Sequence, residues 1–229
     1  MARIATASHP ALAVFFLAAF AFPFNATSSD IRFPCVRSSE CAGVIFGSNV
    51  LVRLEHGRLL TSLDSINWTN HCAGLRTFFR DVTYNQGLFV AVGGSYFDEP
   101  GVIVTSQDGI LWKRRASGTK NNLYGVTFGN GTFIAVGNSG VICTSPNGLH
   151  WKKQRSGTSR LLSAVAARNR IFVVGGESGT ILTSTNAVNW SIGNLGASIY
   201  VNRIAFRSSK FVLNGNDRIF YSHDGLKWQ

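Results

Sequence analysis

The stretch YGVTFGNGTFIAVGNSGVICTSPNGLHW, from Tyr124 to Trp151, contains the unit that the rest of the chain repeats. It reads as three short apolar strands, at 124–128, 132–136 and 140–144. An Asn-Gly pair separates the first two strands, and Asn-Gly between apolar runs is the strongest short-range signal of a β-hairpin. A Ser-Pro-Asn-Gly turn follows the third strand and leads into the tryptophan. The stretch therefore predicts a small antiparallel sheet.

The same pattern occurs five times in the chain, and each copy ends at a tryptophan. These are Trp68, Trp112, Trp151, Trp190 and Trp228. Apolar positions recur in the strands as well. The first strands carry Val44, Val82, Val126, Val165 and Ile204, and the second strands carry Leu51, Phe89, Phe133, Phe172 and Phe211. A repeat of about forty residues that contains several strands is typical of a propeller blade.

The second strand decides between the possible repeat architectures. In the best copy it reads Phe-Ile-Ala-Val (133–136), which is apolar on both sides of its pleat, so both faces must be covered. Four-stranded sheets around an axis meet this need, because each sheet lies between two neighbours. We therefore expect an all-β fold, a five-bladed β-propeller of four-stranded antiparallel blades. A flat solenoid is the alternative, but it needs polar caps at both ends, and the fifth repeat shows none.

A strand near the amino end is expected to close the ring. The sequence reaches Trp228-Gln229 where the fourth strand of the last repeat would begin. When the first repeat is aligned on the third, Ile31–Arg37 falls at the position of a fourth strand. We expect Ile31–Arg37 to complete the last blade, because closure removes sheet edges that would otherwise promote aggregation.

The first residues have the pattern of a secretory signal peptide. A basic residue precedes an apolar run at 11–22, which is too short to span a bilayer, and Ala19-Phe20-Ala21 offers a cleavage site. We expect residues 1–21 to be removed, residues 22–29 to form a flexible tail and residues 30–229 to form one propeller domain. The mature protein is expected to be secreted and to have no membrane span.

The chain is basic, with a formal net charge of +11 at neutral pH, so it attracts anionic partners. Cations are concentrated where the fourth strands of two consecutive repeats begin. They are Lys113, Arg114 and Arg115 in one repeat and Lys152, Lys153 and Arg155 in the next. Because fourth strands are outermost, these six residues are predicted to form a basic rim patch that binds a glycan or an acidic protein. The alternative is a solvated edge that lysine and arginine protect against pairing. Nucleic acid is not an expected partner.

Cysteines and glycosylation sequons bear on the expected export. Cys143 lies in a third strand and is predicted to be a buried free thiol. One disulfide is expected among Cys35, Cys41 and Cys72, and the sequence leaves the pairing open. The sequons are at Asn25, Asn67, Asn130 and Asn189, all in positions predicted to be exposed.

The turn before each tryptophan follows the pattern Ser-x-Asp/Asn-Gly-x-x-Trp. The Asp or Asn side chain is expected to accept from backbone N–H groups two residues on, the glycine permits positive φ, and the tryptophan buries a large ring between sheets. Ser65 and Ala187 replace the glycine, so distorted turns are expected there. The turn residues are Ser62, Asp64, Trp68, Ser106, Asp108, Trp112, Ser145, Asn147, Trp151, Ser184, Asn186, Trp190, Ser222, Asp224 and Trp228.

This turn resembles the Asp-box, or bacterial neuraminidase repeat, of sialidase-type propellers. The resemblance covers residues 38–229, although the turn is one residue shorter than the usual motif. The Ser-Gly-Thr phrases at 117–119 and 156–158, and the run Phe133–Gly137, are similar to propellers of the photosystem II assembly-factor type. In the Asp-box family the motif is structural and lies away from the active site. The resemblance therefore implies no catalytic role for the turn residues.

The sequence does not favour an enzyme. A sialidase-like site needs three arginines around a carboxylate, a tyrosine nucleophile, a glutamate and an acid. The acids outside the turns form no matched acid/base pair along the strands, and no metal spacing, phosphate loop or serine elbow is present. We expect no metal or cofactor, and a recognition or scaffold propeller for a glycan or an acidic extracellular partner. The alternatives are a sialidase-type glycoside hydrolase and an assembly factor that holds a partner protein.

Overall fold

The computed structural model describes residues 32–33, 42–71, 77–95, 101–168, 170–196, 199–216 and 218–229. In these residues the regular structure consists of β-strands and two short 3-10 helices, η2 (Asn138–Gly140) and η3 (Glu177–Gly179). The all-β prediction is therefore confirmed for this part of the chain. The expected signal peptide (1–21) and tail (22–29) lie outside the described residues.

The strands form five antiparallel sheets that follow one another along the chain. In each sheet consecutive strands pair, as the short turns between them predict. The first sheet consists of β1 (Arg32–Phe33), β2 (Ala42–Gly47), β3 (Val50–Glu55), β4 (Arg58–Ser62) and β5 (Thr69–Asn70); the second of β6 (Phe78–Asn85), β7 (Leu88–Gly94), β8 (Val102–Ser106) and β9 (Lys113–Arg115); the third of β10 (Leu123–Gly129), β11 (Thr132–Gly137), β12 (Ile142–Ser145) and β13 (Lys152–Gln154); the fourth of β14 (Leu162–Arg168), β15 (Ile171–Gly176), β16 (Thr180–Ser184) and β17 (Ser191–Asn194); and the fifth of β18 (Val201–Arg207), β19 (Lys210–Gly215) and β20 (Arg218–Ser222).

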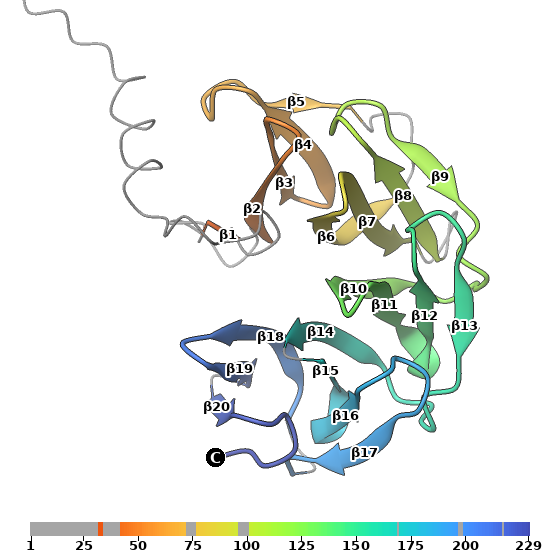
Figure 1. Ribbon diagram of the computed structural model, residues 1–229, viewed down its shortest axis with the longest axis vertical. Helices are drawn as coiled ribbons and strands as arrows, with labels where there is room; N and C mark the ends of the chain where they lie inside the picture. Colours follow the sequence, from red (N-terminus) through yellow and green to blue (C-terminus); the bar gives the residue numbers. More distant parts are fainter. Residues whose placement is uncertain are drawn as a thin grey trace, which may run out of the picture.

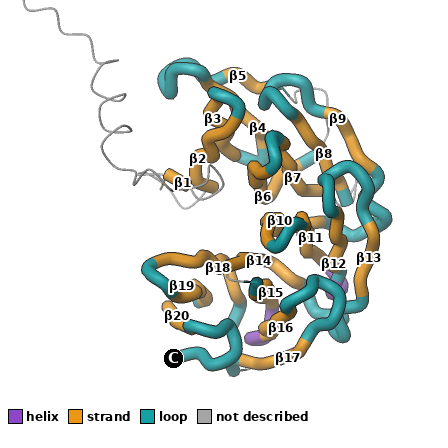
Figure 2. The backbone as a smooth tube through the Cα atoms, in the orientation of Figure 1, coloured by secondary structure: helices purple, strands orange, loops and turns teal. Residues whose placement is uncertain are grey.

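The sheets are arranged as blades along an arc around a common centre (Figure 1). The strands β2, β6, β10, β14 and β18 contact one another in this order on the inside, and β5, β9, β13 and β17 lie on the periphery. Figure 2 shows the same blades with the loops that join their strands. This radial arrangement of antiparallel sheets is that of a β-propeller.

The core consists of layers between neighbouring sheets. Strand β11 contributes to two of these layers, because alternate side chains of a strand point to opposite faces. Phe133 packs with Val90 of the second sheet, whereas Ile134 packs with Leu182 of the fourth sheet. All four side chains are buried. The burial of both faces confirms the reason for which a propeller was predicted.

The prediction that Ile31–Arg37 completes the fifth sheet is wrong for the part of this segment that the structure describes. Strand β1 pairs instead with β2 in the first sheet, with Arg32 opposite Ile45 and Phe33 opposite Val44. Pairing with the next strand along the chain closes a much shorter loop than pairing with the fifth sheet, so it costs less entropy. It also satisfies backbone groups at the edge of β2. The rest of the predicted segment lies outside the described residues.

Four strands per blade is correct for the second, third and fourth sheets, whereas the first sheet has five strands and the fifth has three. Gln229 exchanges two backbone hydrogen bonds with Tyr221, with N···O distances of 2.8 and 3.1 Å. In the third sheet the equivalent residues are Thr144 and Lys152, which lie opposite each other where the outer strand β13 begins. No strand pairing between described residues joins the fifth sheet to the first.

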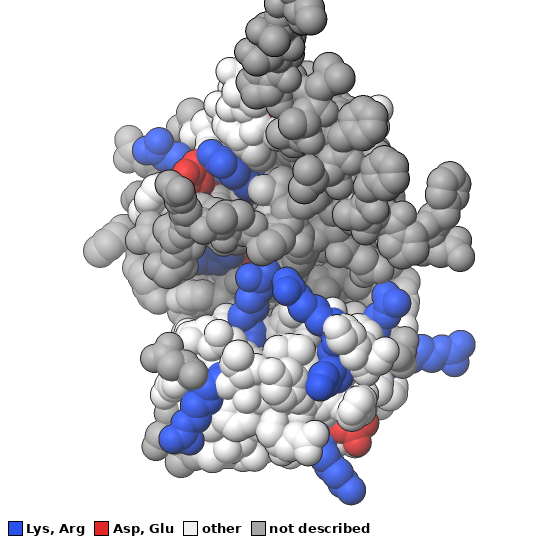
Figure 3. All heavy atoms as spheres, turned by 90° about the vertical axis from the view of Figure 1, so that its left-hand side faces the viewer, with Lys and Arg blue, Asp and Glu red and all other residues white. Residues whose placement is uncertain are grey.

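The outward face of the fifth sheet carries both polar and apolar side chains. The strand register places Arg203 beside Asn214 and Arg207 beside Lys210 on the face that points away from the fourth sheet. Val212 lies between these two pairs on the same face, beside Tyr221 of β20. Figure 3 shows Lys and Arg side chains spread among uncharged residues in the lower half of the view, where this end of the arc lies.

Candidate functional site: the turns and outer strands of the rim

The turns before the tryptophans share one hydrogen-bond geometry. In the second sheet, Asp108 Oδ1 accepts from the backbone N–H groups of Ile110 and Leu111, each at 2.8 Å. Ser106 Oγ donates to the same oxygen at 2.8 Å and accepts from the N–H of Gly109 at 2.9 Å. In the other four turns the side-chain oxygen also accepts from the backbone N–H of the residue two positions later; these acceptors are Asp64, Asn147, Asn186 and Asp224. The predicted turn chemistry is therefore confirmed.

A hydrogen bond that the sequence analysis missed anchors the tryptophan rings. The indole N–H of Trp112 donates to the carbonyl oxygen of Gly109, and that of Trp151 donates to Gly148, both at 2.9 Å. The constant interval of three residues between glycine and tryptophan is the signal that could have revealed it. This hydrogen bond fixes the orientation of the indole ring relative to its own turn and so keeps the ring between two neighbouring sheets.

The two turns without glycine keep the same backbone conformation. The φ angle is +64° at Ser65 and +60° at Ala187, compared with +73° at Gly109. The expected distortion is therefore absent from the backbone, because the turn hydrogen bonds offset the ~1–2 kcal/mol that a side chain costs in the left-handed region. A local difference remains in the fourth sheet, where the buried indole nitrogen of Trp190 has no hydrogen-bond partner among the described residues.

Backbone N–H groups stabilise the charged form of the turn aspartates. Donation from the N–H groups of Leu111 and Ile110 holds the pKa of Asp108 below its usual value. The pKa values of Asp64 and Asp224 are lowered in the same way. A lowered pKa is the opposite of what a general acid requires. The electrostatics of these carboxylates thus agree with a structural role.

We predict that these aspartates make the fold sensitive to acid. Their folded-state pKa lies below the unfolded value of about 3.9, so the unfolded state binds more protons in acid and their contribution to stability is lost as pH falls below about 4. The triple variant Asp64→Asn, Asp108→Asn, Asp224→Asn should lose less of its melting temperature between pH 5 and pH 2.5 than the wild type. Asn147 and Asn186 show that asparagine makes the same turn. Identical melting profiles of the two proteins over this range would refute the prediction.

Five of the six cations of the predicted rim patch lie on the outer strands β9 and β13, as expected, and Arg155 follows the last residue of β13. The five do not share one side. Lys113 and Arg115 lie on the side of β9 that faces the third sheet, because Arg115 is opposite Ile103, which packs against that sheet. Lys153 lies on the side of β13 that faces the second sheet, since it is opposite Cys143.

The other two strand cations, Arg114 and Lys152, lie on the opposite sides of their strands. The structure therefore divides the five strand cations of the predicted patch into a central cluster (Lys113, Arg115 and Lys153) and two flanking residues. Strand alternation is visible in the sequence, but which sides of two strands face each other depends on how the sheets stack. The binding role of the six residues stays a prediction.

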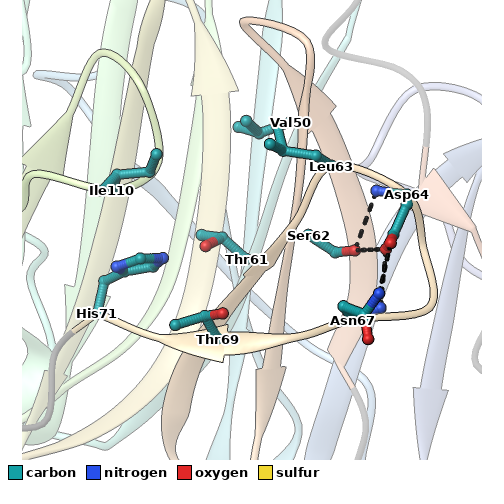
Figure 4. A pocket seen from close by; sticks show the side chains of 9 residues that line it. All are labelled: Val50, Thr61, Ser62, Leu63, Asp64, Asn67, Thr69, His71 and Ile110. Carbon is teal, nitrogen blue, oxygen red and sulfur yellow. Dashed lines mark hydrogen bonds between the residues drawn. The ribbon is translucent and has the colours of Figure 1, made fainter.

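A pocket of about 310 Å³ opens at the rim between the first and second sheets. Figure 4 shows His71 and Ile110 on one side of it and Asp64 and Asn67 on the other, with Thr61 and Thr69 between them. Val50 and Leu63 complete the lining near the turn. Ser62 Oγ donates to Asp64 at 3.0 Å and Asn67 Nδ2 donates to Asp64 at 2.7 Å, so this side of the pocket is the first turn itself.

The pocket lies beside His71, the residue three positions after Trp68, and the side chain at this position is longer in the next two sheets. In the second sheet this position is Arg115, whose Nε donates to Thr105 Oγ1 at 2.8 Å. In the third sheet it is Gln154, whose Nε2 donates to Thr144 Oγ1 at 2.8 Å. The corresponding pair in the first sheet is His71 and Thr61. The shorter histidine leaves open the space that the longer side chains cross elsewhere, and the sequence analysis did not single it out.

The cysteine and sequon predictions are partly tested. Cys143 is a buried free cysteine, as predicted, and burial raises the pKa of its thiol to about 11. The disulfide candidates Cys35, Cys41 and Cys72 lie outside the described residues. Of the sequons, Asn67, Asn130 and Asn189 are exposed, as predicted, and Asn25 lies outside the described residues.

Two of the described acids outside the turns, Asp81 and Glu55, have structural contacts. The carboxylate of Asp81 accepts from the N–H groups of Val82 and Val126, each at 2.9 Å, and so links the second sheet to the third. Glu55 forms an ion pair with Arg53 at 2.9 Å. Within the described ranges no group of three His, Cys, Asp or Glu side chains is placed to hold a metal ion. In the same ranges no helix has the length and apolar character to cross a bilayer.

Comparisons with known proteins bear on the fold. Neither a protein-family model nor a curated protein matches the sequence. Among solved structures, the computationally designed protein Ika8 has a TM-score of 0.60 at 15% identity, over 81% of this chain and 58% of that chain. YCF48 from Cyanidioschyzon merolae has a TM-score of 0.58 at 15% identity, over 86% and 70% of the two chains. The WD40 β-propeller domain of Doa1 has a TM-score of 0.61 at 12% identity, over 79% and 63%.

A second YCF48 structure, bound to a D1 peptide, has a TM-score of 0.59 at 15% identity, over 90% of this chain and 71% of that chain. The chain covers less than two thirds of the length of the Ika8 structure and of the Doa1 structure. At such identities the similarity shows the fold alone, and the relationship to the Asp-box family stays a prediction. The fold that the similarity and the sheet arrangement both indicate is the β-propeller.

Proposed function

We propose that this protein is a secreted, non-enzymatic recognition and scaffold propeller that binds an acidic partner, a sulfated glycan or an acidic protein segment, at its outer rim. The observation that carries the proposal is the central cluster, in which Lys113, Arg115 and Lys153 come from facing sides of two sheets. Asp108 is the only acidic residue between 101 and 168, and its carboxylate is used within its own turn. Cations on facing sides of two sheets, without acids nearby in the sequence, favour an anionic ligand.

Two further observations support a partner-binding role. YCF48, which has a similar fold, has been solved with a bound peptide. The apolar run at 11–22, which contains the cleavage pattern Ala19-Phe20-Ala21, supports export. The proposal includes no catalysis, and purified protein is expected not to hydrolyse a fluorogenic sialoside.

The proposed rim site predicts a specific loss of retention on heparin–agarose. The variant Lys113→Gln, Lys153→Gln, Arg155→Gln should elute at clearly lower salt than the wild type, because converging cations attract an anion more strongly than scattered ones. The matched control is Arg58→Gln, Arg170→Gln, Lys227→Gln, which removes the same charge from exposed positions outside the cluster. We expect the control to elute near the wild type. Equal shifts of both variants would mean that net charge alone causes retention, and the rim site would be disproved.

A further inference from the structure

We propose that the pocket between the first and second sheets holds a large apolar side chain, phenylalanine or tyrosine, of an acidic peptide that Arg114 of β9 attracts. The inference rests on the proposed function and names one partner class for it.

The walls of the pocket favour an apolar side chain. Val50, Leu63 and Ile110 supply aliphatic surface. Leu63 is 73% exposed and Ile110 is 40% exposed, so an apolar group between them would remove aliphatic surface from water, which is favourable. A volume of about 310 Å³ is near the lower end of ligand pockets and suits one side chain.

The polar groups of the pocket favour a peptide over a sugar. The carboxylate of Asp64 and the amide of Asn67 bond each other at 2.7 Å, so the turn already uses them. Thr61, Thr69 and His71 remain near one another in Figure 4, and they suit a phenol or a peptide group. The lining contains no Phe, Tyr or Trp ring on which a sugar ring could stack. The chemistry therefore fits a side chain with at most one polar end.

The position of the pocket explains why the peptide should be acidic. Ile110, which lines the pocket, lies three residues before β9 begins. Arg114 of β9 lies on the side that faces the first sheet, because it is opposite Val104, which packs against that sheet. On the opposite side Asp64 carries a negative charge, which repels a carboxylate placed there. A peptide with its aromatic residue in the pocket and its acids toward β9 satisfies both sides.

The test compares two labelled peptides, Phe-Gly-Glu-Glu-Glu and Ala-Gly-Glu-Glu-Glu, by fluorescence anisotropy at low salt with the full chain. The phenylalanine peptide is expected to bind about tenfold more tightly, because burying the ring is worth somewhat more than 1.4 kcal/mol. The variant His71→Gln should abolish this difference, so that the two peptides bind the variant with similar affinity. Gln154 occupies the equivalent position in the third sheet, and its hydrogen bond to Thr144 shows that a glutamine side chain can cross the corresponding space there.

The outcomes separate the inference from the proposed function. Equal affinity of the two peptides for the wild type would overturn the inference and leave rim binding intact, whereas no binding of either peptide would contradict both. A preference for phenylalanine that survives His71→Gln, in a variant with an unchanged melting temperature, would place the aromatic residue elsewhere and overturn the inference. Displacement of the phenylalanine peptide by a neutral methyl glycoside would show that the pocket takes a sugar, which would overturn it as well.

Discussion

Replacing Gly140 with alanine is expected to lower the free energy of unfolding by about 2–5 kcal/mol, which adds the cost of a side chain at positive φ to that of overpacking. Gly140 has a φ of +67°, and a Cβ atom added to it would overlap the backbone carbonyl oxygen of Thr158. That carbonyl belongs to a rigid loop, because it accepts a hydrogen bond from Ser156 Oγ at 3.1 Å. The Thr158 carbonyl therefore cannot move away from residue 140 without weakening its hydrogen bond to Ser156.

Gly131→Ala is the matched control for this prediction. Gly131 has a φ of +72°, and a Cβ atom there would meet nothing within 4 Å. The control therefore carries the conformational cost alone. Urea denaturation of both variants measures the difference, and equal losses would show that the contact with Thr158 is unimportant. Gly101 and Gly179 meet the carbonyls of Thr119 and Gly196 in the same way.

The second large effect is expected for Phe133→Ala, which should cost about 3–5 kcal/mol. Phe133 is completely buried. Its ring lies 4.6 Å from that of Phe128 and 6.5 Å from that of Trp151, measured between centroids. The substitution leaves a cavity in the layer between the second and third sheets, which the surrounding strands cannot fill because they are held in register on both sides.

The control for Phe133→Ala is the same substitution at Phe78, which is 57% exposed. We expect that change to cost less than about 1 kcal/mol, as is usual for surface positions. Equilibrium unfolding in urea, with a check that the denaturant dependence is unchanged, gives both values. If the two variants lose similar stability, the layers between sheets do not form the core that holds the blades together.

Much of the candidate site follows from local sequence. The hydrogen bonds at Asp108, the left-handed conformation at Gly109 and the outer position of Lys113 were all predictable, because they depend on residues within one turn or on the order of strands in one repeat. The burial of Cys143 follows in the same way from its place in a third strand.

Other features required the assembled sheets. Nothing near His71 in the sequence indicates a pocket, because its walls come from two repeats and its volume depends on how far apart they lie. The division of the basic patch has the same origin, since the sides of β9 and β13 that face each other are determined by how the second and third sheets stack.

The amino-acid sequence by itself therefore determined the all-β repeat, the burial of both faces of the second strands and the chemistry of the turns, because these depend on short-range periodicity and on hydrogen bonds between neighbours. Only the tertiary structure decided that Arg32 and Phe33 pair with β2, that Lys113, Arg115 and Lys153 lie on facing sides of two sheets, and that a pocket opens beside His71. Each of these depends on the relative placement of separate segments. Loop closure and the stacking of sheets determine that placement, and no single repeat contains the information for it.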